Sequence, residues 1–275
     1  DLAGILYLSS GLGGMSGAQP KAADIAGAVS VTAEVDPSRI ETRKQQGWVQ
    51  RVSADLDEVF RWVAEARAHR VPLSIAYAGN VVDLWQYVLD HDIRVELASD
   101  QTSCHAPYDG GYVPAGLDFA AARRLLAEDP GAYAREVDVS LRRQFALIRE
   151  MAARGTRFWD YGNSFLKAVL DAGVQEAAAN GVDAKDGFIF PSYVEHIMGP
   201  VCFDRGYGPF RWVCLSGREE DLERTDAEAM ACIDPARSPQ DRDNHVWIRD
   251  AGRNRLVVGS QARILYADAE GRMRI

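Results

Sequence analysis

The hydrophobic positions along the chain follow two alternating patterns. Short apolar runs typical of buried strands alternate with stretches in which apolar residues recur every three or four positions. The clearest helical pattern spans Ser53–His69, where Leu56, Val59, Phe60 and Val63 share one face of a helix. The apolar runs predict strands at Ile5–Leu8, Val29–Val35, Leu73–Ala78, Ile93–Ala98 and Arg157–Trp159, with a sixth at Phe188–Phe190. Helices are predicted at Ala18–Ala28, after Asp36, over Ser53–His69 and Leu84–Leu89, over 117–153 with a break at Asp129–Gly131, and up to Ala172.

Strands that alternate with helices predict an α/β fold, a Rossmann-like and mostly parallel sheet with helices on both faces. We expect this domain to span residues 1–200. From residue 201 the pattern becomes glycine-rich, aromatic and charged, so residues 201–275 are predicted to begin a second α/β region that the chain cuts off. The first residue is Asp1 and not Met, which suggests a fragment or a processed form.

Composition and charge exclude several classes of protein. The 275 residues carry a formal net charge of −9, and no run of basic residues is present, so a nucleic-acid partner is not expected. No apolar run approaches the ~18 residues of a membrane helix. The four cysteines lack C-x-x-C spacing and are expected to be reduced thiols. The five histidines are scattered, so no metal site is predicted.

A glycine-rich turn follows the first predicted strand and precedes a helix. It reads Gly11-Leu12-Gly13-Gly14-Met15-Ser16-Gly17, a relative of the dinucleotide fingerprint in which the backbone closely approaches a pyrophosphate. Glu34 ends the second strand about 20 residues later, where an acid binds a ribose hydroxyl. These features favour dinucleotide binding over a purely structural turn. Glu34 favours NAD over NADP, although Arg39 lies close by in sequence.

Other polar clusters also follow predicted strands. Gly79-Asn80, Gln101–His105 and Asp160–Asn163 are each consistent with a ligand site, but each is also an ordinary cap or turn. Cys104 beside His105 is a poor nucleophilic pair because sequence neighbours point in different directions. Arg211 lies between aromatic residues, where it could bind a carboxylate or stack in a structural role.

Taken together, these clusters resemble the urocanate hydratase (urocanase) family of histidine degradation. The segments that carry the resemblance are GLGGMSGAQPKAA at 11–23, AEVDPSRI at 33–40, AGN at 78–80, SDQTSCH at 99–105, GYVPAG at 111–116, DYGN at 160–163, GYGPFRWVCLSG at 206–217 and VVGSQARILYADAEGR at 257–272. They occur in order along most of the chain. GGMSGAQP together with DQTS-x-H is not a general Rossmann signature.

The resemblance implies an activity and a set of contacts. Members add water to urocanate, giving imidazolone propionate, as cytoplasmic homodimers that use tightly bound NAD⁺ as an electrophile and not as a hydride acceptor. The implied NAD contacts are Gly14, Met15, Ser16, Glu34, Arg39, Asn80, Val81, Gln101, Thr102, Ser103, Cys104, His105, Tyr112, Val113 and Tyr161. Arg211 becomes a candidate for holding the substrate carboxylate. No metal is implied.

Two departures from the family pattern limit these implications. Many bacterial members carry a reactive cysteine in an A-R-I-C-W segment, but here that position is Leu265, which excludes an essential thiol there. Members are also roughly twice as long as this chain. We therefore expect the chain alone to lack turnover. The alternatives are an NAD-dependent dehydrogenase and a stand-alone dinucleotide-binding module.

Overall fold

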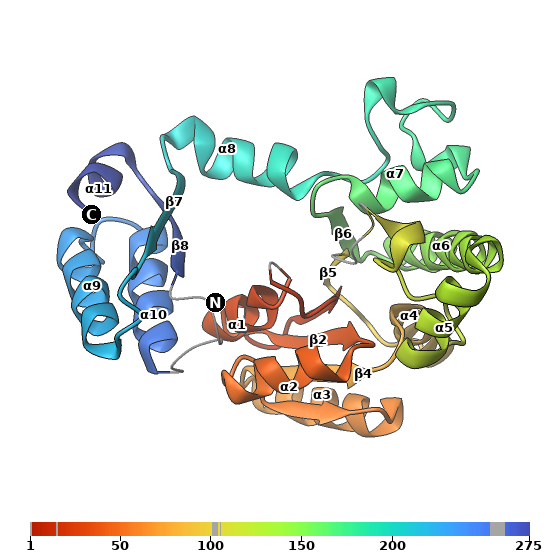
Figure 1. Cartoon of the computed structure of the whole chain (residues 1–275), viewed down its shortest axis with the longest axis horizontal. Helices are drawn as coiled ribbons and strands as arrows, with labels where there is room; N and C mark the ends of the chain where they lie inside the picture. Colours follow the sequence, from red (N-terminus) through yellow and green to blue (C-terminus); the bar gives the residue numbers. More distant parts are fainter. Residues whose placement is uncertain (1, 15, 101–103, 105, 254–261) are drawn as a thin grey trace. The chain divides into compact units, whose positions relative to one another are not determined.

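The computed structural model describes residues 2–14, 16–100, 104, 106–253 and 262–275. It divides into two compact units (Figure 1). The first contains residues 1–44 and 48–194, and the second contains residues 45–47 and 195–275. Each unit has its own sheet and its own apolar core, so we describe the two separately.

A six-stranded parallel sheet forms the centre of the first unit. Its strands are β1 (Leu6–Ser10), β2 (Val29–Glu34), β3 (Arg51–Ser53), β4 (Leu73–Ala78), β5 (Leu97–Asp100) and β6 (Arg157–Asp160). They pair in the order β3-β4-β2-β1-β5-β6, and every pairing is parallel. Strands β2, β3 and β4 lie on one side of β1, and the chain then crosses to add β5 and β6 on the other side. This reversal creates a switch point between β1 and β5, where doubly wound sheets bind ligands.

Helices cover both faces of this sheet, as the alternating pattern predicts. They are α1 (Ala18–Ile25), α2 (Pro37–Gln45), α3 (Leu56–His69), α4 (Val81–Asp90), α5 (Phe119–Glu128), α6 (Pro130–Ala153) and α7 (Ser164–Asp171). Side chains of α3, α4, α6 and α7 form one large core with alternate residues of the strands, such as Leu8 and Val31. Smaller clusters, centred on Ala23 of α1 and Ile40 of α2, lie against other strand positions. The α/β prediction is therefore confirmed.

Several predicted elements differ from the structure; the strand expected at Ile93–Ala98, for example, is β5 and begins only at Leu97. Residues 51–53 form the short edge strand β3, and helix α3 begins only at Leu56, with Asp55 as its N-cap. Phe188–Phe190 is not a strand of the sheet, since Phe188 makes only an isolated bridge to Ala178. The rings of Phe190 and Phe158 meet edge to face, with centroids 5.0 Å apart. That apolar run therefore reflects core packing and not strand pairing.

The second unit is built on a two-stranded antiparallel sheet. Strand β7 (Gly208–Val213) pairs with β8 (Ala262–Ala267), and helices α9 (Glu219–Cys232), α10 (Pro239–Arg253) and α11 (Ala269–Arg274) belong to the same unit. The core of the second unit consists of Ala229, Ile233, Ile248 and Leu265, so the side chain of Leu265 is a packing residue.

Short helical segments also occur among the described residues. They are α8 (Gly199–Val201), the π-helix Tyr193–Met198 and the 3₁₀ turns Pro107–Asp109, Gln175–Ala177, Ala184–Asp186 and Phe203–Arg205.

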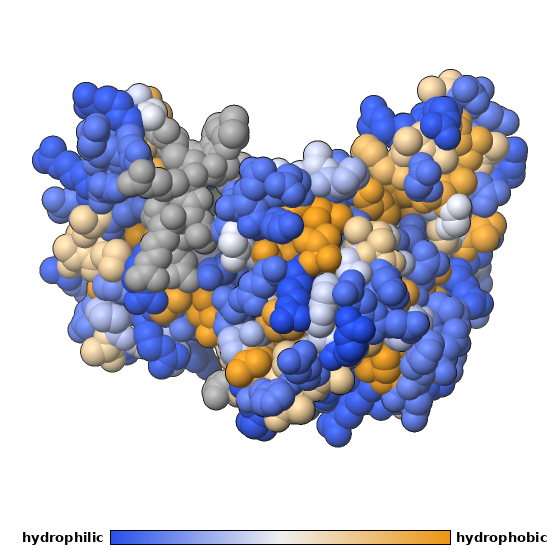
Figure 2. Space-filling view, turned by 90° about the horizontal axis from the view of Figure 1, so that it is seen from below, coloured by the Kyte–Doolittle hydropathy of each residue, from blue (hydrophilic) through white to orange (hydrophobic). Residues whose placement is uncertain are grey.

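The face displayed in Figure 2 is mainly hydrophilic, with apolar patches between the polar side chains. Within the described ranges, no helix combines the length and the apolar character needed to span a bilayer. The same residues contain no group of three or more histidine, cysteine or acidic side chains arranged to hold a metal ion.

Candidate functional site

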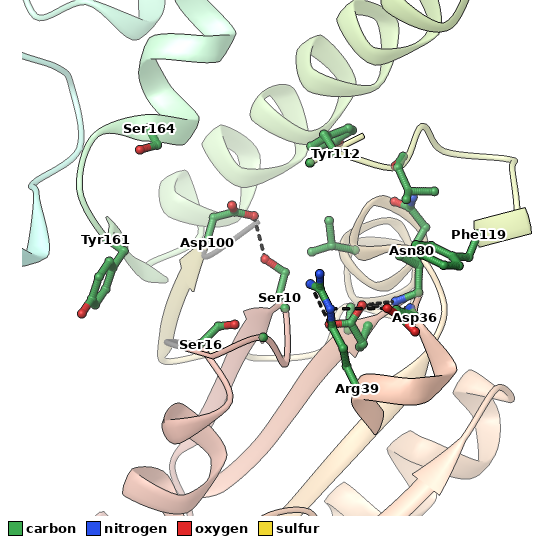
Figure 3. A pocket seen from close by; sticks show the side chains of 18 of the residues that line it. Ser10, Ser16, Asp36, Arg39, Asn80, Asp100, Tyr112, Phe119, Tyr161 and Ser164 are labelled. Atoms are coloured by element: carbon green, nitrogen blue, oxygen red, sulfur yellow. Dashed lines mark hydrogen bonds and ion pairs between the residues drawn. The ribbon is translucent and has the colours of Figure 1, made fainter. Parts of the chain in front are cut away.

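A cavity of ≈ 570 Å³ opens at the carboxyl ends of the parallel strands in the first unit. Its lining comes from the ends of β1, β2, β5 and β6, from the segments that follow them, and from residues 79–81 after β4. Figure 3 shows Asp36 and Arg39 on one side, Tyr161 and Ser164 on the other, and Ser10, Ser16 and Asp100 between them. The cavity therefore crosses the switch point, the position expected for a ligand in this class of sheet.

The glycine turn after β1 forms one wall of this cavity. Gly11 adopts a φ of +82°, which favours glycine, and its N–H donates to the Ala33 carbonyl at 2.8 Å. Gly17 N–H donates to the Gly13 carbonyl at 2.9 Å and closes the turn. A Cβ on Gly14 would meet nothing within 4 Å. The turn thus presents bare backbone to the open cavity, as a pyrophosphate-binding loop requires.

Arg43 of α2 holds this turn from behind. Its Nε donates to the Leu12 carbonyl at 3.0 Å, its Nη2 donates to the Gly13 carbonyl at 2.6 Å, and its guanidinium lies 5.1 Å from the Trp48 ring. A Cβ on Gly17 would lie only 2.0 Å from Arg43 Nε, so only glycine allows this approach. Burial, and secondarily the nearby Arg39, lower the pKa of Arg43.

Substitution Arg43→Leu is expected to lower the free energy of unfolding by about 2–3 kcal/mol, because two turn carbonyls lose a charged donor. Arg51→Leu is the matched control, since Arg51 also stacks on a tryptophan, Trp62 at 5.0 Å, but is exposed. The control should change the free energy by less than ~0.5 kcal/mol. Urea unfolding of both variants checks this, and equal losses in the two would contradict it.

Glu34 joins the glycine turn to the end of β2. Its buried carboxylate accepts the Leu12 N–H on Oε2 at 2.7 Å and the Val35 and Asp36 N–H groups on Oε1, both at 2.9 Å. Arg39 Nη1 lies 4.0 Å from Oε2. Because each carboxylate oxygen can accept more than one hydrogen bond, Oε2 can still receive a hydroxyl donor from the cavity.

Asn80 and Tyr112 position another wall of the cavity, which is formed by residues 112–113. Asn80 caps α4 by accepting the Val82 N–H at 2.9 Å, and its amide donates to the Val113 carbonyl at 2.9 Å. The buried Tyr112 hydroxyl donates to Gln144 of α6 at 2.8 Å. These bonds fix the backbone of residues 112–113 against the cavity.

Two buried aspartates lie at the ends of β5 and β6. Asp100 and Asp160 are register partners, each is 1% exposed, and both line the cavity. Ser10 Oγ donates to Asp100 at 2.9 Å, and the Leu166 N–H donates to Asp160 at 3.0 Å. Burial, together with the neighbouring Asp100, raises the pKa of Asp160 to about 6, although backbone N–H bonds partly oppose the shift.

This pKa predicts a pH dependence of stability. The folded pKa of Asp160 lies above its unfolded value, so the folded chain holds the proton more tightly. The contribution of Asp160 to the free energy of unfolding is therefore most favourable below the unfolded pKa, and it is lost as pH rises through about 6. Between about pH 4.5 and 7.5 the loss amounts to about 2 kcal/mol. The Asp160→Asn variant should not show this pH-dependent loss of unfolding free energy.

Urea unfolding at several pH values measures the pH-dependent contribution of Asp160 as the wild-type free energy of unfolding minus that of Asp160→Asn. A difference that stays constant over this pH range would contradict the prediction. Asp109→Asn provides a control, since Asp109 is exposed and lies outside the cavity lining.

The structure brings together most of the predicted contacts that it describes. Nine of them line the cavity: Gly14, Ser16, Glu34, Arg39, Asn80, Val81, Tyr112, Val113 and Tyr161. Met15, Gln101, Thr102, Ser103 and His105 lie outside the described residues. Cys104 is not among the residues that line the cavity, and its side chain is buried in the core. Arg211 is exposed on β7 in the second unit.

The predicted contacts omit several lining residues, among them Ser10, Asp36, Asp100, Phe119, Asp160 and Ser164. A signal existed for the two buried aspartates, because each is the last residue of a strand in a parallel sheet. Phe119 comes from the start of α5, and no sequence spacing connects it to the glycine turn.

Strand order, glycine turn and cavity define the first unit as a Rossmann-like α/β domain of the kind that binds dinucleotides. A family model described as the urocanase Rossmann-like domain matches residues 1–197, and the urocanase C-terminal domain matches residues 200–275. The chain belongs to the urocanase family.

Curated relatives agree with this assignment. The chain is 47% identical over 284 residues to a probable urocanate hydratase of Caenorhabditis elegans and 48% identical over 287 residues to one of Dictyostelium discoideum. It is 46% identical over 290 residues to urocanate hydratase of Homo sapiens. Each match covers 100% of this chain and 42% of the relative. The chain thus spans less than half the length of these proteins.

Proposed function

We propose that the first unit binds NAD⁺ in the cavity at the switch point, and that the chain supplies the NAD-binding part of a urocanate hydratase. The observation that carries the proposal is the open glycine turn at Gly14, which lines the same cavity as Glu34. A dinucleotide needs both features, one for its pyrophosphate and one for a ribose. The relatives named urocanate hydratase indicate the reaction, the addition of water to urocanate to give imidazolone propionate.

In this proposal each wall of the cavity binds a different part of the dinucleotide. The backbone of Gly14–Ser16 binds the pyrophosphate, and Glu34 accepts a ribose hydroxyl on Oε2 while Arg39 lies beside it. Asn80 and Val81, Tyr112 and Val113, the segment Gln101–His105, and Tyr161 complete the contacts. When bound, NAD⁺ would supply an electrophilic ring. Arg211 is proposed to hold the carboxylate of the substrate.

Isothermal titration of the 275-residue chain with NAD⁺ tests the binding site. We expect one site per chain and a weaker response to NADP⁺, because the additional phosphate would meet the carboxylate of Glu34. Absence of any heat with NAD⁺, in a chain whose circular dichroism is that of a folded α/β protein, would overturn the proposal.

A second candidate function is an NAD-dependent dehydrogenase, because the general Rossmann geometry serves hydride transfer equally well. It would produce the absorbance of NADH when given an alcohol or a hydroxy acid, whereas a urocanate hydratase consumes urocanate without net reduction of NAD⁺. The family also leads us to propose a cytoplasmic homodimer. Light scattering after gel filtration tests the dimer.

A further inference from the structure

The two buried aspartates have no task in the function proposed so far. Asp100 and Asp160 are register partners on the neighbouring strands β5 and β6, and each is the last residue of its strand and lines the cavity. Among the described residues, Asp160 is hydrogen-bonded to backbone N–H groups and makes no ion pair with lysine or arginine. Two acids this close raise the cost of ionising both, a cost that a positively charged ligand would relieve.

The position of this pair relative to the glycine turn indicates which part of a dinucleotide it meets. Glu34 ends β2, on one side of β1, while Asp100 and Asp160 end β5 and β6, on the other side. In doubly wound sheets the two nucleotide halves lie on opposite sides of the switch point. If Glu34 binds the adenosine ribose, the aspartate pair lies in the half that receives the nicotinamide nucleotide.

We propose that Asp100 and Asp160 make this cavity select the oxidised nicotinamide ring over the reduced ring. The inference rests on the proposed function, that the cavity binds NAD. The oxidised ring carries a positive charge and the reduced ring is neutral, while the rest of the two molecules is identical. A buried carboxylate pair attracts that charge through a medium of low dielectric constant and gives the neutral ring no such gain.

This selection fits a protein that uses the nicotinamide as an electrophile. An electrophilic ring must remain oxidised through every cycle. Preferential binding of the oxidised form keeps the reduced form from accumulating in the site, since a ligand shifts a population only through its differential affinity. The pair would thus separate this chain from a dehydrogenase, which has to hold both forms.

Both aspartates also have structural partners, so the test must separate charge from architecture. Asp160 accepts the Leu166 N–H within the first turns of α7, and Asp100 accepts bonds from Ser10 and Gln144. Substitution of a residue with only a structural role would weaken the binding of NAD⁺ and of NADH to the same extent. A residue that acts through its charge changes the ratio of the two dissociation constants.

The experiment measures the dissociation constants of NAD⁺ and NADH for the 275-residue chain near pH 7.5, by calorimetry and by NADH fluorescence. We expect wild type to bind NAD⁺ at least about tenfold more tightly than NADH. Asp160→Asn and Asp100→Asn should each reduce this preference by roughly tenfold. Asp36→Asn is the matched control, because Asp36 lines the cavity on the Glu34 side and should leave the ratio unchanged.

Wild type that binds both forms equally, or NADH more tightly, would overturn the inference without any variant, and the NAD assignment would stand. Folded Asp160→Asn and Asp100→Asn variants with the wild-type ratio would overturn it as well. Failure of wild type to bind either form would overturn the NAD assignment itself and this inference with it.

Discussion

Substitution Gly14→Val is expected to lower the affinity for NAD⁺ by about 100-fold, or ~2.7 kcal/mol, without lowering thermal stability. A Cβ at this position meets no protein atom within 4 Å, so the valine side chain has space in the ligand-free chain. That same space lies in the cavity, where the pyrophosphate of a bound dinucleotide must approach the backbone. Calorimetry with NAD⁺ and a melting curve measure the two effects separately.

Gly131→Val is the control for this substitution. Gly131 is an exposed glycine of the first turn of α6, away from the cavity lining, so valine there should leave NAD⁺ affinity unchanged. If Gly14→Val retained wild-type affinity, the turn would have a structural role only. A large drop in melting temperature would instead show that the open space beside Gly14 belongs to the packing of the turn.

The described geometry also refines the role expected of Glu34. The sequence motif predicts an acid that meets a ribose, and the structure shows a carboxylate already holding three backbone N–H groups. The same side chain therefore shapes the glycine turn through Leu12 and belongs to a residue that lines the cavity. Replacing Glu34 would disturb the turn and the ligand together, which makes it a poor probe of ribose binding. Gly14 is the cleaner test.

Local chemistry explains why much of the fold could be predicted from the sequence. Asp129 before Pro130 marks the break between two helices, since its side chain accepts the Ala132 N–H at 2.8 Å while proline begins α6. The parallel strands were predictable because their apolar runs are buried on both faces. These signals depend on neighbours in sequence and need no knowledge of distant contacts.

The misassigned elements depend on distant contacts. Strand β3 has three residues, none fully buried, and it exists because Arg51–Ser53 pairs with Ile75–Tyr77 of β4. Phe190 has the apolar character of a strand residue but packs its ring against Phe145 and Phe158. Hydrophobic periodicity reports burial, and burial alone does not distinguish pairing from packing.

The candidate site divides in the same way. The glycine turn, Glu34 and Asn80 were found because each stands where a strand ends in a recognisable motif. The pair Asp100–Asp160 spans sixty positions and becomes visible only through the register of β5 with β6. Cys104 lies within the motif that carried the family resemblance, yet its side chain belongs to the core. Family motifs therefore located the cavity, while the structure decided which side chains face it.

Gln144→Leu is expected to lower the free energy of unfolding by about 4 kcal/mol, the largest stability loss predicted for a single polar side chain in this unit. Gln144 is 0% exposed; its amide nitrogen donates to Asp100 and its oxygen accepts the Tyr112 hydroxyl at 2.8 Å. Leucine has a similar volume but leaves the Tyr112 hydroxyl without that acceptor and removes a donor from a buried carboxylate. Urea unfolding measures the loss.

The second variant, Tyr112→Phe, separates the two halves of this network. It removes only the hydroxyl, and Gln144 still donates to Asp100, so the expected loss is about 1–2 kcal/mol. The double variant should lose less than the sum of the single variants, because the Tyr112–Gln144 bond is counted in both. Full additivity would mean that these side chains act independently. The polar chain from Ser10 through Asp100 and Gln144 to Tyr112 would then not hold the cavity walls as one unit.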